Sequence, residues 1–170
     1  HVSKLIHQAK KSERFGIKTS GKTDMKKVKE YIKEKQNLIR KHENAEYFRK
    51  QGMQVVLGEA KFNSKNSVLV NEREYFGKKI VLATGSKPRK LKIKGVEKLK
   101  YGKEYLDNQS VFELEKLPKK TLIIGGGPIG IELGEALNRL GSQVIVFEKG
   151  DKFKKKKKKE VTDLLLKQLK

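Results

Sequence analysis

The stretch from Thr121 to Gly150 restricts the fold of this chain more than any other part of the sequence. A short apolar run, Leu122–Ile124, leads directly into the glycine pattern G-x-G-x-x-G at 125–130. Apolar residues then recur at helical spacing, and a second β-rich run, 144–147, ends at Glu148. This order of strand, glycine turn, helix, strand and acid predicts a β-α-β unit whose turn approaches a dinucleotide.

Each glycine of this pattern has a physical role in such a unit. Gly125 allows the tight turn, Gly127 removes a Cβ so that the backbone can approach a pyrophosphate, and Gly130 lets the helix pack close to the strands. The start of the helix adds N–H groups and the positive end of its dipole. The alternative is a glycine-rich turn without a ligand, but both strands, the helix and the acid favour the nucleotide site. The helix is expected to end at Gly141.

Glu148 lies 18 residues after Gly130, where a carboxylate can accept hydrogen bonds from adenosine ribose hydroxyls. A carboxylate there repels a 2′-phosphate, so the sequence favours NAD over NADP. Lys149 and Lys152 are nearby cations that weaken this preference, and NADP therefore stays possible. The same glycine pattern also serves FAD, so the pattern alone does not choose the dinucleotide.

The chain is strongly basic, with 42 Lys and Arg against 20 Asp and Glu and a formal net charge of +22. Only six of those 42 residues are arginines, which read guanine and phosphate through two parallel hydrogen bonds. The charge therefore indicates a basic solvated surface that attracts polyanions without specificity. No aromatic stacking platform interleaves the lysines and no recognition helix is evident, so specific nucleic-acid binding is not expected.

Cysteine is absent, which excludes a disulfide, a thiolate metal site and a cysteine nucleophile within this chain. The spacing of the three histidines, His1, His7 and His42, does not suggest a metal cage. Neither a transmembrane segment nor a signal peptide is visible, so a cytoplasmic location without membrane contact is expected. The chain begins without methionine, in what looks like the middle of a helix, as if its true N-terminus were missing.

The first part of the chain predicts two amphipathic helices. Residues 1–14 carry a partial apolar face that ends at Gly16. A longer lysine-rich helix begins after Thr23 or Asp24, either of which can cap it, and a break is expected at 42–44. We interpret the long helix as a packing element rather than a calmodulin-type or membrane helix, because its apolar stripe is thin.

Residues 53–83 read as short strands separated by polar turns. The predicted strands are 53–57, 60–62, 68–70, 74–76 and 79–83. The last of them contains the continuously apolar run Ile80–Ala83, which predicts a buried strand. Residues 87–120 are rich in charge, with a short helix expected at about 108–115, and Pro118 marks a domain boundary.

Lys154–Lys159 is a run of six lysines, and 160–170 is a helical pattern that ends abruptly. Runs of like charge repel one another and usually stay solvated. A surface loop is therefore preferred for the lysine run over a nuclear-localisation or polyanion patch.

Two segments together resemble a known family. The apolar strand IVLATGSKP at 80–88 ends in Ala-Thr-Gly-Ser, and the glycine pattern follows about 35 residues later, after the helix-like QSVFELEKLPKK. This order resembles the flavoprotein pyridine nucleotide–disulfide oxidoreductases, which include dihydrolipoamide dehydrogenase, glutathione reductase and mercuric reductase. The segment GGGPIGIELGEALNRLGSQV, with FGI, a long helix, GEAKF and ATGS in order, looks most like the mercuric reductase-like and dihydrolipoamide dehydrogenase-like branch.

The resemblance implies an α/β fold: a Rossmann-like parallel sheet that starts the NAD domain, preceded by part of an FAD domain with a long helix and a small β-meander. Residues 1–118 are then the partial FAD-binding domain and connector, and residues 119–170 are the N-terminal part of the NAD(P)-binding domain. The implied cofactors are FAD and NAD, with NADP possible. The full-length enzymes of this kind are expected to be homodimers.

The resemblance also carries roles to matching residues. Glu132 matches the family's glutamate near the nicotinamide and the flavin, although a plain surface glutamate in the first turn of the helix is the alternative, which the helix dipole also favours. The expected NAD contacts are Gly125, Gly126, Gly127, Pro128, Ile129, Gly130 and Glu148. The expected FAD contacts are Ala60, Ala83, Thr84, Gly85 and Ser86.

The chain departs from the family pattern in what it lacks. The family's own FAD glycine fingerprint and its CxxxxC redox pair are not present, and neither is the C-terminal dimerisation domain with its His-Glu pair. The sequence is therefore expected to be a central slice of a longer enzyme. The isolated slice is expected to have little or no oxidoreductase activity and to bind FAD poorly.

The favoured function is that of part of an FAD-dependent oxidoreductase. Such an enzyme passes hydride from NAD(P)H to flavin and on to a redox disulfide, here outside the chain, and then to a small-molecule or disulfide substrate. Two alternatives stay open: an NADH oxidase-like or ferredoxin reductase-like flavoprotein without the disulfide, and a non-enzymatic basic polyanion-binding module.

Overall fold

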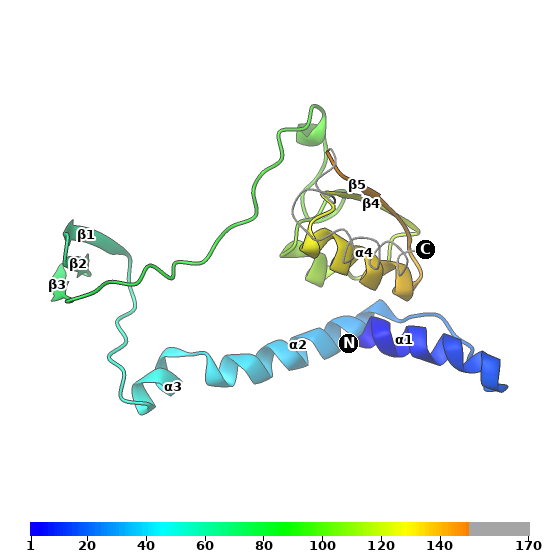
Figure 1. Cartoon of the computed structure of the whole chain (residues 1–170), viewed down its shortest axis with the longest axis horizontal. Helices are drawn as coiled ribbons and strands as arrows, with labels where there is room; N and C mark the ends of the chain where they lie inside the picture. Colours follow the sequence, from blue (N-terminus) through cyan, green and yellow to red (C-terminus); the bar gives the residue numbers. More distant parts are fainter. Residues whose placement is uncertain (150–170) are drawn as a thin grey trace, which may run out of the picture. The chain divides into compact units, whose positions relative to one another are not determined.

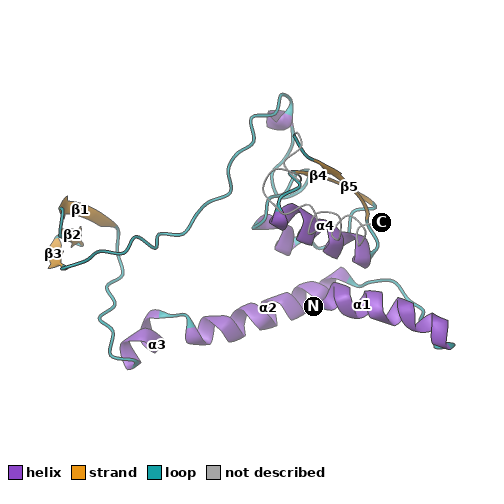
Figure 2. Ribbon diagram, viewed as in Figure 1, coloured by secondary structure: helices purple, strands orange, loops and turns teal. Residues whose placement is uncertain are grey.

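The computed structural model of the 170-residue chain describes residues 1–149 (Figure 1). The predicted lysine run at 154–159 and the helix at 160–170 lie outside the described residues. The chain forms two compact units. Within the described residues, the first contains residues 1–31 and 97–149, and the second contains residues 32–96. Their elements make up a mixed α/β fold with a three-stranded antiparallel sheet and a two-stranded parallel sheet (Figure 2).

The first unit opens with helix α1 (Val2–Lys11), which continues as the 3-10 turn η1 (Ser12–Phe15). Gly16 ends this segment with a φ of 81°, a left-handed conformation that glycine adopts without steric cost. The predicted helix over 1–14 and its stop at Gly16 are therefore confirmed. Helix α1 packs against helix α4 (Pro128–Leu140) of the same unit (Figure 1).

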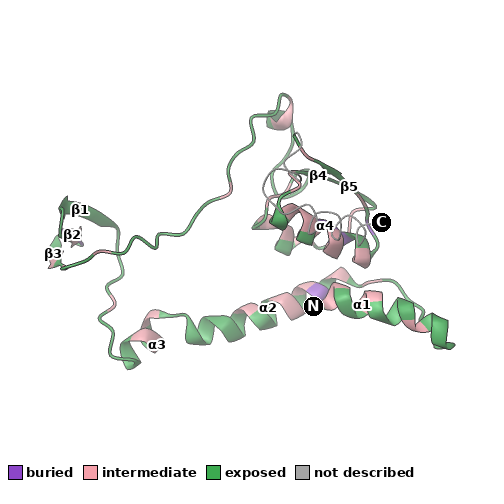
Figure 3. Cartoon of the chain, viewed as in Figure 1, coloured by how far each residue is buried: buried purple, intermediate pink, exposed green. Residues whose placement is uncertain are grey.

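Helix α2 (Met25–His42) begins in the first unit and continues in the second. Of the two predicted caps, Asp24 is the one that acts, because its Oδ1 accepts from the backbone N–H of Lys26 at 2.9 Å. Thr23 instead donates its hydroxyl to the carbonyl of Leu140 at 3.1 Å, which connects the start of α2 to the end of α4. Val28 is the buried residue of α2 (Figure 3).

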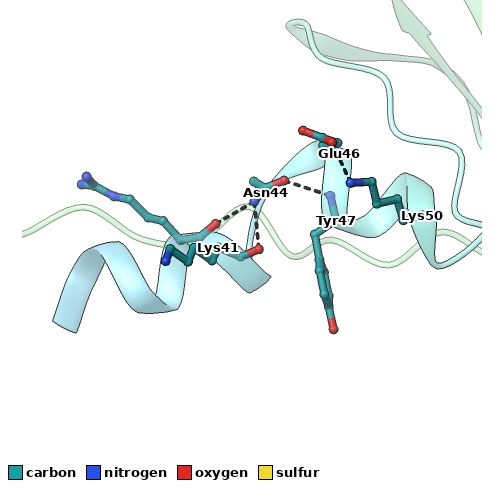
Figure 4. A network of polar contacts seen from close by, with 6 residues as sticks. Lys41, Asn44, Glu46, Tyr47 and Lys50 are labelled. Carbon is teal, nitrogen blue, oxygen red and sulfur yellow. Dashed lines mark hydrogen bonds and ion pairs between the residues drawn. The ribbon is translucent and has the colours of Figure 1, made fainter. Parts of the chain in front are cut away.

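The predicted break after α2 is confirmed, and Asn44 explains it. Its Nδ2 donates to the carbonyls of Arg40 at 2.8 Å and Lys41 at 3.1 Å, the last turn of α2. Its Oδ1 accepts from the N–H of Tyr47 at 2.9 Å, so the same side chain caps helix α3 (Ala45–Lys50) (Figure 4). One asparagine thus satisfies backbone groups of two helices.

The second unit contains an antiparallel meander of β1 (Ala60–Ser64), β2 (Ser67–Val70) and β3 (Arg73–Phe76) (Figure 2). Asn71 and Glu72 join β2 to β3 with φ of 49° and 66°, as a two-residue hairpin turn of the favoured hand requires. Three of the five predicted strands are therefore confirmed, together with the small meander.

Two predicted strands, 53–57 and 79–83, are wrong. Neither segment is a strand in the structure, and in the second of them Val81 is 86% exposed and Leu82 is 70% exposed. An apolar run becomes a buried strand only where neighbouring strands take its backbone hydrogen bonds and another layer covers its side chains. Within residues 1–149, no strand pairs with either segment.

The parallel sheet is made by β4 (Lys120–Ile124) and β5 (Gln143–Phe147), with α4 between them in sequence. Their register pairs Lys120 with Gln143 and Ile124 with Phe147. Helix α4 packs against the sheet through its buried residues Gly134 and Leu137 (Figure 3). The predicted order of strand, helix and parallel strand is confirmed, and so is the end of the helix at Gly141, whose φ is 117°.

The connector before β4 contains two short 3-10 turns, η2 (Val96–Lys98) and η3 (Ser110–Glu113). The predicted helix at about 108–115 is thus present only as a single short turn. Asp107 accounts for its position, because its Oδ1 accepts from the N–H groups of Ser110 at 2.8 Å and Gln109 at 3.0 Å. Its Oδ2 accepts from the hydroxyl of Tyr101 at 2.9 Å.

These hydrogen bonds give the connector a pH-dependent stability. The N–H of Ser110, helped by that of Gln109 and by the Tyr101 hydroxyl, lowers the pKa of Asp107 from 3.8 to about 2. A lowered carboxyl pKa stabilises the folded state above the unfolded pKa, and this stabilisation is lost as the pH falls through the folded pKa. Asp107→Asn is therefore expected to melt at a lower temperature than the wild type near neutral pH. In circular-dichroism melts, this difference in melting temperature should shrink as the pH falls from 3.8 to about 2. A difference that does not change with pH would contradict the role given to the Asp107 carboxylate.

Candidate functional site

The loop between β4 and α4 forms the candidate site. Gly125 has a φ of +112°, and its N–H donates to the carbonyl of Phe147 at 2.7 Å, so the turn begins while still bonded to the end of β5. Gly127 is the N-cap of α4 and Pro128 is its first residue. Proline suits that position because its missing N–H would have no partner within the helix. No side chain caps this helix end, so no capping side chain satisfies its first N–H groups.

Gly130 is required by packing within the protein. A Cβ at this position would lie 2.0 Å from the carbonyl oxygen of Gly125, so the backbone of the loop or the helix would have to move to accommodate it. Gly134, one turn later, would place a Cβ 3.0 Å from Cδ1 of Ile123 and 3.5 Å from Cγ1 of Val144. Both glycines therefore let α4 lie directly on the two strands. Sequence reasoning identified Gly130 but missed Gly134, although the four-residue spacing that puts both on one helix face was a readable signal.

Gly127 differs from these two glycines. Its φ of −70° and ψ of 174° are open to any residue, and a Cβ built on it meets no atom within 4 Å. The residue is also exposed. Nothing among the described residues therefore requires glycine at 127, and the space above its Cα is open to a ligand.

Glu148 reaches back to the same loop. Its Oε2 accepts from the N–H of Gly126 at 2.6 Å, across 22 residues of sequence. The carboxylate is half-buried at the end of β5, beside the start of α4. The tertiary structure thus brings the predicted acid and the predicted glycine loop into direct contact, at the edge where parallel strands present their carboxyl ends to ligands. Lys149, the predicted modulator of the NAD preference, is exposed next to it.

Two further predicted residues lie on α4 itself. Ile129, an expected NAD contact in the first turn, is 55% exposed. Glu132 is exposed on the next turn. Glu132 follows the glycine loop on α4, but it lines neither of the two hollows described in this structure. Its position near the nicotinamide therefore stays a prediction.

The residues predicted to contact FAD all belong to the second unit. Ala60 is the exposed first residue of β1. Ala83, Thr84, Gly85 and Ser86 are exposed and belong to no strand. As they stand, these residues form no enclosed cradle for a flavin. Nearby, Gly58 has a packing role of its own, since a Cβ there would lie 2.4 Å from Oδ1 of Asn71.

Within residues 1–149, no helix has both the length and the apolar character needed to cross a bilayer. In the same residues, no group of three or more His, Asp or Glu side chains is placed to hold a metal ion.

Comparison with known proteins gives one consistent result. The family profile described as "Pyridine nucleotide-disulphide oxidoreductase" matches residues 3–170. A mercuric reductase of Lysinibacillus sphaericus is 31% identical over 99% of this chain, and a dihydrolipoyl dehydrogenase of Mycoplasma genitalium is 32% identical over 99%. The flavoprotein disulfide reductase RclA from Escherichia coli, solved as a Cu(II) complex, matches the fold with a TM-score of 0.68 over 98% of the chain, at 24% identity.

The chain spans about a third of these proteins. It covers 30% of the mercuric reductase, 37% of the dihydrolipoyl dehydrogenase and 36% of the solved reductase. The similarity therefore concerns one continuous portion of each relative.

Proposed function

Since the chain belongs to the pyridine nucleotide-disulphide oxidoreductase family, we propose that it is the portion of an FAD-dependent oxidoreductase that grips NAD(P)H. In this proposal residues 119–170 start the Rossmann-like NAD(P)-binding domain. Residues 1–118 are the connector and part of the FAD-binding domain, with the long helix and the meander. The whole enzyme passes hydride from NAD(P)H to the flavin and on to a redox disulfide that lies outside this chain.

The observation that carries the proposal is the open space over Gly127. Gly130 and Gly134 are explained by contacts within the protein, whereas Gly127 has an ordinary backbone conformation and no neighbour within 4 Å. A glycine that the protein does not need indicates a ligand that approaches its backbone closely. A diphosphate bound there meets the N–H groups and positive dipole end of α4, as dinucleotide sites require.

Glu148 supplies the second set of contacts with the nucleotide. The carboxylate is fixed at the loop by the Gly126 N–H, with one oxygen, Oε1, left to accept from a ribose hydroxyl. Its negative charge opposes a 2′-phosphate, so NAD is the preferred nucleotide and NADP the second choice. Glu132 is assigned to the region where the nicotinamide meets the flavin, and Gly126, Pro128 and Ile129 to contacts along the loop.

The proposal gives this chain no disulfide chemistry of its own. It has no cysteine, so the thiol step and the small-molecule or disulfide substrate belong to other parts of the enzyme. Because the FAD set forms no cradle here, the isolated chain should bind FAD poorly and show little oxidoreductase activity. The relatives, a mercuric reductase and a dihydrolipoyl dehydrogenase, favour the disulfide-dependent branch over an NADH oxidase-like or ferredoxin reductase-like enzyme. A homodimer in the full-length enzyme is part of the same proposal.

A substitution of Glu148 tests the proposed nucleotide site. Glu148→Arg is expected to weaken NADH binding by about tenfold and to reverse the NADH/NADPH preference, because it replaces a ribose acceptor with a phosphate-binding cation. The measurement is a titration of the chain with both nucleotides, followed by the change in nucleotide fluorescence. Glu30→Arg, an exposed position on α2, is the matched control because it changes the net charge by the same amount. An unchanged NADH/NADPH ratio in Glu148→Arg would remove Glu148 from the nucleotide site.

A further inference from the structure

A hollow lined by basic residues lies in the first unit, on the side of α4 that faces α1. Helix α1, the turn η1 and the last turn of α4 line an open hollow of about 440 Å³, here called the α1–α4 groove. Four cationic side chains line it: Lys4 and Lys11 from α1, Arg14 from η1 and Arg139 from α4. The groove is far along α4 from the glycine loop, since Arg139 is in the last turn and the loop precedes the first (Figure 1).

Helix geometry explains why the charges converge. Lys4 and Lys11 are seven residues apart, two turns of α1, so both lie on the face directed at the groove. Arg139 reaches it from across the α1–α4 contact and is itself paired with Glu135, one turn earlier. Within residues 1–149, no ion pair joins Lys4, Lys11 or Arg14 to a carboxylate. The groove therefore keeps a surplus of positive charge.

An aromatic ring completes the groove. Phe15 is 71% exposed, and the guanidinium of Arg14 lies 4.5 Å from its ring centroid. Other phenylalanines of the chain are also exposed, such as Phe76 at 73%, so what distinguishes Phe15 is its position beside the cationic side chains of the groove. A ring flanked by an arginine and lysines is an arrangement on which nucleobases stack. The sequence predicted no aromatic platform among the basic residues, because Phe15 is the only aromatic residue near these lysines in sequence. The fold adds Arg139 from the other end of the chain to the same place.

We propose that the α1–α4 groove binds single-stranded nucleic acid, with one base stacked on Phe15 and the flanking phosphates held by Lys4, Lys11 and Arg14. A hollow of about 440 Å³ lies within the size range of small-ligand sites and suits one nucleotide of a strand that continues over the surface. Binding depends on stacking and charge and does not select a sequence. The formal net charge of +22 attracts the strand to the protein. This site is independent of the proposed NAD(P)H function.

The first test removes the ring. Phe15→Leu keeps an apolar side chain of similar size but removes the stacking surface. It is expected to weaken binding of a fluorescein-labelled oligothymidylate by about tenfold in fluorescence anisotropy, within the range measured for a lost base stack. A duplex of the same length, whose bases are already stacked, should bind more weakly than the single strand and be insensitive to Phe15→Leu. Unchanged single-strand affinity in Phe15→Leu would overturn the proposal.

The second test separates the groove from the overall charge. Lys4→Gln/Lys11→Gln/Arg14→Gln is compared with Lys98→Gln/Lys103→Gln/Lys116→Gln, three exposed lysines of the same unit that do not line the groove. Across about 50 to 200 mM salt, the slope of log affinity against log salt should fall by about two in the groove variant, since each lost phosphate contact removes about 0.7. If the two variants lost affinity and salt dependence equally, the binding would be nonspecific charge attraction only, and the proposal that the groove binds the strand would be wrong. NADH binding should stay unchanged in both, which keeps this test separate from that of the glycine loop.

Discussion

Gly127→Ala is expected to reduce the affinity of the chain for NADH by about 10- to 100-fold, equivalent to about 1.4–2.7 kcal/mol, while leaving the fold intact. The added methyl group points into open space and meets no protein atom within 4 Å, at a backbone conformation that alanine also adopts. The stability of the free protein is therefore expected to stay unchanged. A dinucleotide diphosphate that lies against the Gly127 backbone would collide with the new Cβ, so the loss should appear only on binding.

Two measurements check this prediction. Thermal melts of Gly127→Ala and wild type should agree, and NADH titrations should differ by the factor above. Wild-type affinity in Gly127→Ala would mean that no diphosphate lies over this residue. The proposed function would then lose its main support, even if Glu148 still affected nucleotide choice.

Gly130→Ala is expected to have the opposite profile, with a large loss of stability. Its Cβ would lie 2.0 Å from the carbonyl oxygen of Gly125, and both atoms belong to the backbone framework of the loop. The clash can be relieved only by moving α4 away from β4. Forcing extra atoms into a packed site costs about 1–3 kcal/mol or more, which at the upper end lowers the melting temperature of a domain of this size by about 6–12 °C.

Gly134→Ala provides the graded control for Gly130→Ala. Its Cβ would meet the terminal Cδ1 of Ile123 at 3.0 Å, and a side-chain end can rotate away where a backbone carbonyl cannot. We therefore expect a smaller loss, about 1 kcal/mol or less, followed by thermal melts of the two variants side by side. Equal stability of Gly130→Ala and wild type would show that α4 does not lie as close to the loop as described.

The elements that could be predicted from the sequence are those whose causes are local. Gly16 and Gly141 end helices because each takes a left-handed conformation, and Asn44 breaks α2 from α3 because its short amide reaches backbone groups on both sides. The β4-α4-β5 unit could be predicted for the same reason. The changes between strand-like and helical spacing of its apolar residues, and its glycine turn, all lie within 30 residues.

The errors arose where the cause was distant. The run Ile80–Ala83 has the composition of a buried strand, but burial depends on strands and side chains from elsewhere in the molecule, and the described residues provide none. The predicted helix before β4 shrank to the turn η3 because Asp107 holds only a single turn of N–H groups. Propensity and pattern report the local preference of a segment and not whether a partner exists.

The sequence by itself determined the order strand, glycine turn, helix, strand and acid, because sterics and hydrogen bonds within a few residues enforce each step. The sequence also assigned roles to Gly127 and Gly130, but only the tertiary structure supplied the contacts that distinguish them: Gly130, and with it Gly134, serves packing, while Gly127 faces open space. The tertiary structure also decided that Glu148 bonds the loop through Gly126. These distinctions depend on which atoms of segments distant in sequence come within a few ångströms of one another. Such contacts are known only from the folded structure, because close packing is set by the whole tertiary arrangement.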